Sequence, residues 1–220
     1  MNNKFLLIGA GAQGRVTSDI LEDSGFEVHG FLDDDTSLLG KEISGKMIIG
    51  KIDKAIEMSK DNYKLIICIG HNHHRKIISE KLKLDISSYG NAIHTSSVIL
   101  KSASLGYGNM IFAQTYIGSN AQIKNHTIIN NGCIVEHDCI VEDYVSLSPG
   151  CCMGGRATIG KAAFISAGVT INPRITIGAN SIIGSGSVVV RNIPEKVLAY
   201  GIPAKVIRKI KPDEMWESLL

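Results

Sequence analysis

An aliphatic residue recurs at every sixth position through the C-terminal half of the chain. The series starts at Ile93 and runs without a gap to Val189, and every member is Ile, Leu, Val or Met. Hydrophobic residues make up 44% of the sequence, so chance does not produce an unbroken series of this length. The seventeen members are Ile93, Ile99, Leu105, Ile111, Ile117, Ile123, Ile129, Val135, Val141, Leu147, Met153, Ile159, Ile165, Ile171, Ile177, Ile183 and Val189.

The six-residue period predicts a parallel β-solenoid. A unit of six residues is too short for a pair of helices but suits a short strand and a tight corner, so three units make one triangular coil. The aliphatic residues point inward, and residues eighteen apart stack at the ~4.8 Å spacing of neighbouring strands. Two positions before each aliphatic residue the side chain is usually small, as at Ala121, Cys133 and Ala157, which indicates little room there.

Residues 1–90 follow a different pattern, in which short apolar runs alternate with amphipathic stretches. This pattern predicts a βαβ unit and a small doubly wound parallel sheet with a ligand at the carboxyl ends of its strands. We therefore expect an α/β Rossmann-like domain over 1–90, an all-β solenoid over 91–200, and a turn with a short helix over 201–220. The expected strands are Phe5–Ile8, Phe26–Leu32 and Lys64–Gly70, and the expected helices are Arg15–Ser24, Ile52–Lys60, His73–Leu82 and Pro212–Leu220.

Composition argues against several classes of function. The formal net charge is only +2, which gives no electrostatic reason to expect nucleic acid, and no run reaches the ~18 apolar residues of a membrane span. The five cysteines lack paired C-x-x-C spacing, so neither a disulfide framework nor a zinc knuckle fits. A cytoplasmic protein is expected, because a reducing compartment suits unpaired cysteines.

A glycine-rich turn follows the first expected strand. Gly9, Gly11 and Gly14 satisfy G-x-G-x-x-G between a strand and a helix, and Asp33 follows nineteen residues after Gly14, as in dinucleotide sites. Three interpretations stay open: a nicotinamide dinucleotide, a nucleotide or nucleotide-sugar, and a purely structural turn. If a ligand binds, backbone amides at the helix N-terminus face a phosphate. The candidate contacts are Gly11, Ala12, Gln13, Asp33, Asp34, Gly70 and Asn72.

The acidic residues of the repeat region are concentrated in one coil. Between positions 93 and 194 the carboxylates are Glu136, Asp138, Glu142 and Asp143. His137 lies among them, two residues beyond the inward-facing Val135, so we expect its ring to face outward beside a carboxylate that favours proton acceptance. The cluster predicts a catalytic base, with a solvated surface histidine as the alternative. No metal is expected, because His126 and His137 are eleven residues apart rather than one coil of eighteen.

Together these features resemble the hexapeptide acyltransferases. The resemblance rests on the unbroken repeats, on Glu136–Cys139 and on the terminal Gly201–Lys205. More narrowly, Ile8–Gly14 and Phe31–Asp34 resemble the group that contains nucleotide-linked amino-sugar N-acetyltransferases, of the bacillosamine and perosamine types, and sialic-acid O-acetyltransferases. The resemblance implies a left-handed parallel β-helix, against the usual right-handed crossover, and a homotrimer that holds acetyl coenzyme A between adjacent prisms.

The resemblance also implies roles for single residues. His137 would be the general base, Asp138 the acidic neighbour that raises its basicity, and the backbone N–H of Gly155, eighteen residues later, the oxyanion donor. Asn130 would contact the acceptor. The implied contacts to acetyl coenzyme A are Ser146, Ala167 and Ser185.

The predicted function is acetyl transfer from acetyl coenzyme A to the amine of a nucleotide-linked amino-deoxy-sugar, within polysaccharide biosynthesis. Direct attack is expected, because no nucleophile pair is evident and Cys139 occupies a cramped repeat position. Two alternatives remain: O-acetylation of a sugar such as sialic acid, and a non-catalytic protein that binds a nucleotide-sugar within a synthase complex. A nicotinamide oxidoreductase would leave the solenoid unexplained.

Overall fold

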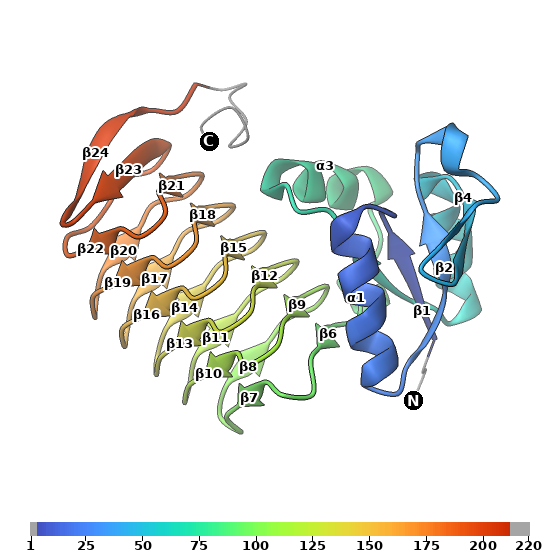
Figure 1. Cartoon of the computed structure of the whole chain (residues 1–220), viewed down its shortest axis with the longest axis horizontal. Coiled ribbons are helices and arrows are strands. Elements are labelled where there is room, and N and C mark those ends of the chain that lie inside the picture. Colours follow the sequence, from blue (N-terminus) through green and yellow to red (C-terminus); the bar gives the residue numbers. More distant parts are fainter. Residues whose placement is uncertain (1–3, 212–220) are drawn as a thin grey trace. The chain divides into compact units, whose positions relative to one another are not determined.

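The computed structural model describes residues 4–211. The chain forms two compact units, which Figure 1 colours from blue to green and from green to red. The first unit contains the residues up to Thr95 together with Tyr107–Met110. The second contains Ser96–Gly106 and the residues from Ile111 onward.

The first unit is built on a five-stranded sheet. Its strands are β1 (Lys4–Ile8), β2 (Glu27–Leu32), β3 (Glu42–Ile43), β4 (Lys46–Gly50) and β5 (Lys64–Ile67). They lie in the order β3-β4-β2-β1-β5, and all neighbours are parallel except the antiparallel pair β3–β4. The predicted parallel sheet is therefore confirmed, whereas the β3–β4 hairpin was not predicted: β3 has only two residues, and the five-residue β4 was also missed.

The helices depart from the prediction mainly at one place. The helices α1 (Ala12–Asp23) and α3 (Asn72–Leu82) correspond to two of the predicted helices, although α1 begins three residues before the predicted start at Arg15. The continuous helix predicted over Ile52–Lys60 is wrong: this stretch forms the 3₁₀ turn η2, the short helix α2 and the 3₁₀ turn η3. Their bounds are Ile52–Lys54, Ala55–Met58 and Ser59–Asp61, and further 3₁₀ turns are η1 (Thr36–Leu38) and η4 (Ile86–Ser88). Within residues 4–211 no helix has the length and apolar character needed to cross a bilayer.

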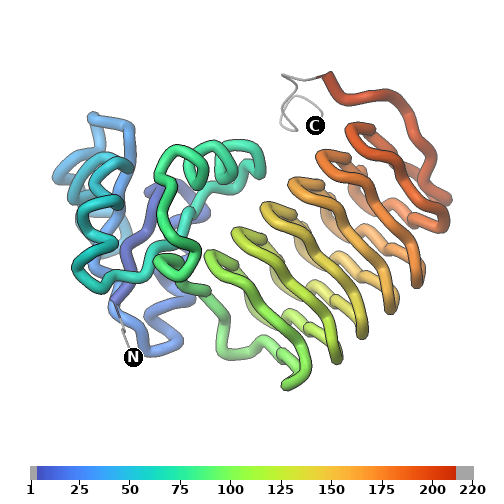
Figure 2. Tube along the Cα trace, turned by 180° about the vertical axis from the view of Figure 1, so that it is seen from behind, coloured from blue at the N-terminus to red at the C-terminus, as the bar shows by residue number. Residues whose placement is uncertain are grey.

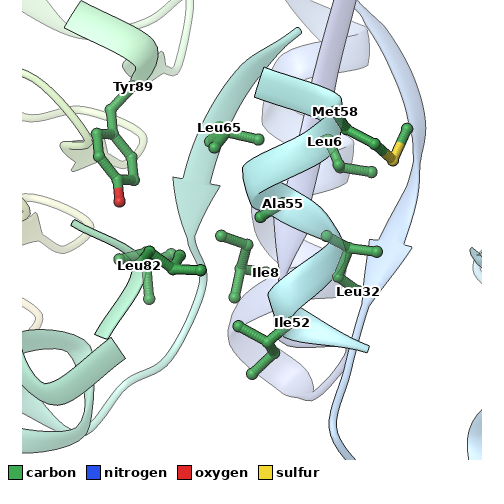
Figure 3. Packing of buried hydrophobic residues seen from close by; sticks show 10 residues of the cluster. Leu6, Ile8, Leu32, Ile52, Ala55, Met58, Leu65, Leu82 and Tyr89 are labelled. Atoms are coloured by element: carbon green, nitrogen blue, oxygen red, sulfur yellow. The ribbon is translucent and has the colours of Figure 1, made fainter. Parts of the chain in front are cut away.

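Three residues of this stretch are buried at intervals of three. Ile52, Ala55 and Met58 belong to the core cluster of the first unit, and this interval places side chains on one side of either a 3₁₀ helix or an α-helix. Figure 3 shows these side chains against the strand residues of one sheet face. The core cluster contains Leu6, Ile8, Leu32, Ile52, Ala55, Met58, Leu65, Ile67, Leu82 and Tyr89.

The hexad repeats fold into a parallel β-helix of two-residue strands, seen as stacked coils in Figure 2. The strands are β6 (Ala92–Ile93), β7 (Val98–Ile99), β8 (Ser104–Leu105), β9 (Met110–Ile111), β10 (Tyr116–Ile117), β11 (Gln122–Ile123), β12 (Ile128–Ile129), β13 (Ile134–Val135), β14 (Ile140–Val141), β15 (Ser146–Leu147), β16 (Cys152–Met153), β17 (Thr158–Ile159), β18 (Phe164–Ile165), β19 (Thr170–Ile171), β20 (Thr176–Ile177), β21 (Ile182–Ile183) and β22 (Val188–Val189). They form three sheets: the first face (β7, β10, β13, β16, β19, β22), the second face (β8, β11, β14, β17, β20) and the third face (β6, β9, β12, β15, β18, β21).

The third face is continued by a hairpin. Strand β23 (Val197–Gly201) pairs with β21 in parallel and with β24 (Ala204–Lys209) antiparallel, so the turn predicted at 201–205 belongs to this hairpin. The helix predicted over Pro212–Leu220 lies outside the described residues.

Residues eighteen apart pair in register, as the period predicted. Ile117 pairs with Val135, Val135 with Met153, and Met153 with Ile171. From Ile111 to Val189 each inward aliphatic residue of the series is at most 1% exposed. The aliphatic series is therefore a continuous core column on each face.

The small residues two positions earlier are buried and also satisfy backbone groups. The Thr115 hydroxyl lies 3.2 Å from the Asn130 carbonyl, and the Cys151 thiol lies 3.1 Å from the Ser166 carbonyl, in both cases fifteen residues onward. A side chain with one short polar arm fits the limited room and pairs a buried carbonyl.

The corners of the coils use left-handed backbone. A residue with positive φ recurs at every sixth position, for example Asn120 at +58°, Asp138 at +59° and Arg156 at +64°. This conformation costs roughly 1–2 kcal/mol for a residue with a β-carbon, and glycine occupies it at only some corners, such as Gly132 and Gly150. The coil-to-coil contacts therefore hold non-glycine residues in this conformation.

Replacing Ala157 with leucine should destabilise the protein by about 1–3 kcal/mol, because the position is fully buried and a larger side chain overpacks it. The control Thr158→Leu adds a leucine one residue later, on the outward side of β17, and should change the unfolding free energy by less than about 0.5 kcal/mol. Equilibrium urea denaturation at one protein concentration measures both. Equal losses would show that the position before the strand is not sterically restricted.

Candidate active site

The glycine turn lies between β1 and α1, at the carboxyl end of the parallel strands (Figure 1). The Gly9 amide donates to the Leu32 carbonyl at 2.8 Å, and Gly9 has a φ of +102°. A β-carbon at Gly14 would overlap the Gly9 carbonyl, so the third glycine permits close helix packing. A β-carbon at Gly11 would meet nothing within 4 Å. The space beside the Gly11 backbone is thus open.

The two candidate aspartates hold backbone groups around this turn. The Asp33 carboxylate accepts from the amides of Ala10 and Asp35, both at 2.9 Å. The Asp34 carboxylate accepts from the Ile52 amide at 3.0 Å. Asp33 thereby ties the end of β2 to the glycine turn, a positioning role that spacing alone did not reveal.

Ala12 and Gln13 form the first turn of α1. The Gln13 side-chain amide lies 3.4 Å from the Met110 sulfur, and the Thr17 hydroxyl contacts the same sulfur at 3.4 Å. The Gln13 side chain is therefore engaged by Met110. The backbone N–H groups of a first helical turn have no intrahelical partner, so they are the groups of this segment suited to an anion.

The loop between β5 and α3 is held by a buried arginine. Arg75 is fully buried and donates through Nη1 to the carbonyls of Ile69 at 2.9 Å and Gly70 at 2.8 Å, and through Nη2 to the Asn72 side chain at 3.1 Å. Gly70 and Asn72 were predicted as ligand contacts, whereas Arg75 was missed. An arginine in an amphipathic helix gives no sequence signal of burial, because most such arginines are exposed.

His137 lies at the corner after β13, on the edge between the first and second faces, which we term the histidine edge. Its side chain is 53% exposed, and Nδ1 lies 2.9 Å from Oδ2 of Asp138. The ring faces outward as expected. A carboxylate that accepts the Nδ1 proton leaves the Nε2 lone pair free to accept another proton.

Asp138 is surrounded by groups that favour its ionised form. The hydrogen bond to His137 lowers the pKa of this carboxyl most, followed by the hydrogen bond from the Asn120 amide at 3.3 Å and the charge of Arg156, whose Nε lies 3.6 Å away. Asn120, Asp138 and Arg156 are successive residues of one column, eighteen apart. Sequence reasoning missed Asn120 and Arg156, although the eighteen-residue spacing could have found both.

Gly155 lies against the His137 ring. A β-carbon built at Gly155 would overlap Nε2 and would lie 2.7 Å from Cε1 of that ring, so a residue larger than glycine cannot occupy this place without moving the imidazole. Gly155 is itself buried, yet its N–H donates to no group in residues 4–211. This amide belongs to the residue that lies against the imidazole.

The remaining predicted residues lie on other parts of the β-helix. Asn130 follows β12, and Ser146 is a buried residue of β15, so both belong to the third face. Ala167 and Ser185 lie at corners after the third-face strands β18 and β21. One chain therefore brings together His137, Asp138 and Gly155 at the histidine edge. The other predicted residues, Asn130, Ser146, Ala167 and Ser185, lie elsewhere on the same chain.

Cys139, two residues from His137, is not suited to act as a nucleophile. All five are free, and four are buried, including Cys139. Burial raises the pKa of the Cys139 thiol, and burial raises the pKa of Cys68 to about 12, so neither forms a thiolate readily at neutral pH. Among residues 4–211 no three His, Cys, Asp or Glu side chains gather in the manner of metal ligands.

Comparison with family models identifies both units. Residues 4–82 match the PglD N-terminal domain, and residues 156–191 match the bacterial transferase hexapeptide (six repeats). No curated protein sequence matches the chain.

Solved structures of sugar acetyltransferases are similar over nearly the whole chain. A histidine-to-alanine variant of GDP-perosamine N-acetyltransferase from Caulobacter crescentus, in complex with CoA and GDP-perosamine, is 31% identical with a TM-score of 0.86, and the match covers 94% of this chain and 97% of that one. The acetyltransferase domain of PglB from Neisseria gonorrhoeae FA1090, in complex with acetyl coenzyme A, is 28% identical with a TM-score of 0.86, covering 94% and 100%. WeeI from Acinetobacter baumannii AYE is 25% identical with a TM-score of 0.80, covering 93% and 100%. The chain belongs to the hexapeptide-repeat sugar acetyltransferases and is an acyltransferase.

Replacing Arg75 with methionine should lower the unfolding free energy by about 2–4 kcal/mol, because the buried carbonyls of Ile69 and Gly70 lose their donor. The control Arg15→Met makes the same change at an exposed arginine of α1 and should have an effect below about 0.5 kcal/mol. Urea denaturation measures both variants. Similar small effects would exclude a structural role for the Arg75 hydrogen bonds.

Proposed function

We propose that this protein transfers the acetyl group of acetyl coenzyme A to the amino group of a nucleotide-linked amino-deoxy-sugar. The observation that carries the proposal is the arrangement of three residues: Asp138 holds Nδ1 of His137, Nε2 lies against Gly155, and the Gly155 amide is unused by residues 4–211. Similarity to a protein described as GDP-perosamine N-acetyltransferase supports an amine acceptor on a nucleotide-linked sugar.

His137 acts as the general base. The acceptor amine must lose a proton as its nitrogen attacks the thioester carbonyl, and Nε2 of His137 takes that proton. Asp138 retains the ring in the required tautomer and stabilises the imidazolium that forms, because its carboxylate lies 2.9 Å from Nδ1. Such base catalysis contributes roughly 10² to 10⁴ in rate.

The Gly155 amide stabilises the charge that develops on the carbonyl oxygen. In the tetrahedral intermediate this oxygen becomes an anion, and its hydrogen bond from Gly155 N–H contributes roughly 10² to 10³. The carbon–sulfur bond then breaks, and the His137 imidazolium returns its proton to the departing thiolate. The products are an amide and coenzyme A, with no acyl-enzyme.

The glycine turn of the first unit holds the nucleotide part of the acceptor. The N–H groups of Gly11, Ala12 and Gln13 at the start of α1 face the phosphates, because an exposed helix N-terminus attracts an anion. Asp33 and Asp34 offer acceptors for ribose or base donors. The loop containing Gly70 and Asn72 completes this site, and Asn130 contacts the sugar.

The acyl donor is held between copies of the chain in a homotrimer, with Ser146, Ala167 and Ser185 as its contacts. The first face supports association, because it presents Val98 and Ile134 outward at 52% and 39% exposure. We assign the protein to the cytoplasm, where five free cysteines persist, and to the biosynthesis of a polysaccharide from activated sugars.

A mass-spectrometric assay tests the function. The purified protein is incubated with acetyl coenzyme A and with UDP-, GDP- and dTDP-linked amino sugars, in parallel with free sialic acid. Gain of one acetyl group by a nucleotide amino sugar is expected. Acetylation of sialic acid alone would assign O-acetyl transfer, and no coenzyme A binding in a thermal-shift assay would indicate a non-catalytic sugar-nucleotide-binding protein.

The His137→Ala variant should lose at least a factor of about 100 in kcat, because no neighbouring group replaces the base. Its oligomeric state should not change, since the side chain is 53% exposed. Steady-state kinetics and size-exclusion chromatography measure the two properties. The control His29→Ala removes another exposed imidazole, from β2, and should retain wild-type kcat. Turnover near the wild-type value in His137→Ala would remove this residue from the mechanism.

The Gly155→Ala variant should reduce kcat by about tenfold or more, because the new methyl group displaces the His137 ring. The control Gly160→Ala introduces a methyl group against the Ala179 backbone, so it should reduce thermal stability without a comparable loss of kcat. Kinetics and thermal melts on both variants separate the two effects. An active Gly155→Ala variant would mean that the ring does not need its observed position.

A further inference from the structure

The coils beyond His137 contain basic residues but no acidic ones. Residues 144–194 contain no Asp or Glu, and their basic residues are Arg156, Lys161, Arg174 and Arg191. Lys161 lies 3.6 Å from the Asp143 carboxylate. The other three basic residues are arginines. Arginine, unlike lysine, has a planar guanidinium group whose N–H donors match the oxygens of a phosphate.

The β-helix places these three arginines on the histidine edge. Arg156 directly follows Gly155, and the Arg174 amide donates to the Gly155 carbonyl at 3.0 Å. Strands β19 and β22 pair in register, and Arg191 follows β22 at the corner one coil further. This corner is two residues shorter than the others, because Ile193 pairs with Ile177. At ~4.8 Å per coil, Arg191 lies roughly 14 Å along the axis from His137.

Two of the arginines have no anionic partner in the described part of the chain. Arg156 pairs with Asp138 at 3.6 Å, whereas Arg174 and Arg191 are exposed and form no side-chain hydrogen bond or ion pair with residues 4–211. Like charges on neighbouring strands repel one another. An anion that bridges the coils would convert this repulsion into charge-assisted hydrogen bonds.

We propose that Arg156, Arg174 and Arg191, which we term the arginine edge, bind the phosphate groups of the acyl donor. This inference rests on the proposed function, because it takes acetyl coenzyme A as the donor. The donor is long, and its phosphates are separated from its thioester by an extended arm. When the thioester lies at Nε2 of His137, the extended arm of acetyl coenzyme A runs along the histidine edge. Its phosphates then reach the coils of Arg174 and Arg191. The acceptor's phosphates have a separate site at the glycine turn.

The test compares two thioesters that differ in phosphate. In the double variant Arg174→Gln/Arg191→Gln, KM for acetyl coenzyme A should rise at least tenfold, while KM for the nucleotide sugar and kcat at saturation change less than twofold. Acetyl pantetheine has the same thioester without phosphate, and its kcat/KM should not change. Arg156 is left intact because it contacts Asp138.

The control Lys161→Gln removes one charge from a different edge of the same coils and should leave KM for acetyl coenzyme A within twofold of wild type. If the double variant is unstable in thermal melts, the wild type supplies the test: rising ionic strength should increase KM for acetyl coenzyme A but not for acetyl pantetheine. Equal effects on the two thioesters, or a rise in KM for the nucleotide sugar instead, would overturn the proposal. A wild type that uses no acetyl coenzyme A overturns the proposed function itself, whereas an active wild type with an unaffected double variant overturns the arginine edge alone.

Discussion

The register between coils is the constraint on which the rest of this structure depends. Each strand of the β-helix has only two residues, so a coil is held by its hydrogen bonds to the coils above and below and by the aliphatic core that they share. A shift of one residue would turn the core side chains outward. The eighteen-residue register is therefore strictly maintained, and every side chain has a defined neighbour in the next coil.

The candidate active site uses this stacking in three ways. It places His137 against Gly155, where the missing β-carbon makes room for the ring. It places Asp138 between Asn120 and Arg156, which favour the carboxylate form. It also leaves the amide of Gly155, the residue that lies against the His137 ring, without an acceptor in residues 4–211. One repeated geometry thus supplies steric fit, electrostatics and a hydrogen-bond donor.

Much of the fold could be predicted because its signals are local. The hexad period predicted the coils and their core, and the alternation of apolar runs predicted a parallel sheet with α1 and α3. The failures arose where the deciding contact is distant. The stretch Ile52–Asp61 breaks into two 3₁₀ turns and a short helix, with Ile52, Ala55 and Met58 in the core of the first unit. Arg75 is buried because the loop after β5 folds back over its guanidinium.

The sequence by itself determined the period, the two-unit organisation and the concentration of acidic residues around His137, because these properties depend on the order of neighbouring residues. Only the tertiary structure decided that the His137 ring lies against Gly155, that the Gly155 amide is unused within residues 4–211, and that the arginines beyond it form an edge. These features depend on distances between atoms in different coils. Hydrogen bonding between strands sets those distances, and composition or spacing does not reveal which backbone groups remain unpaired.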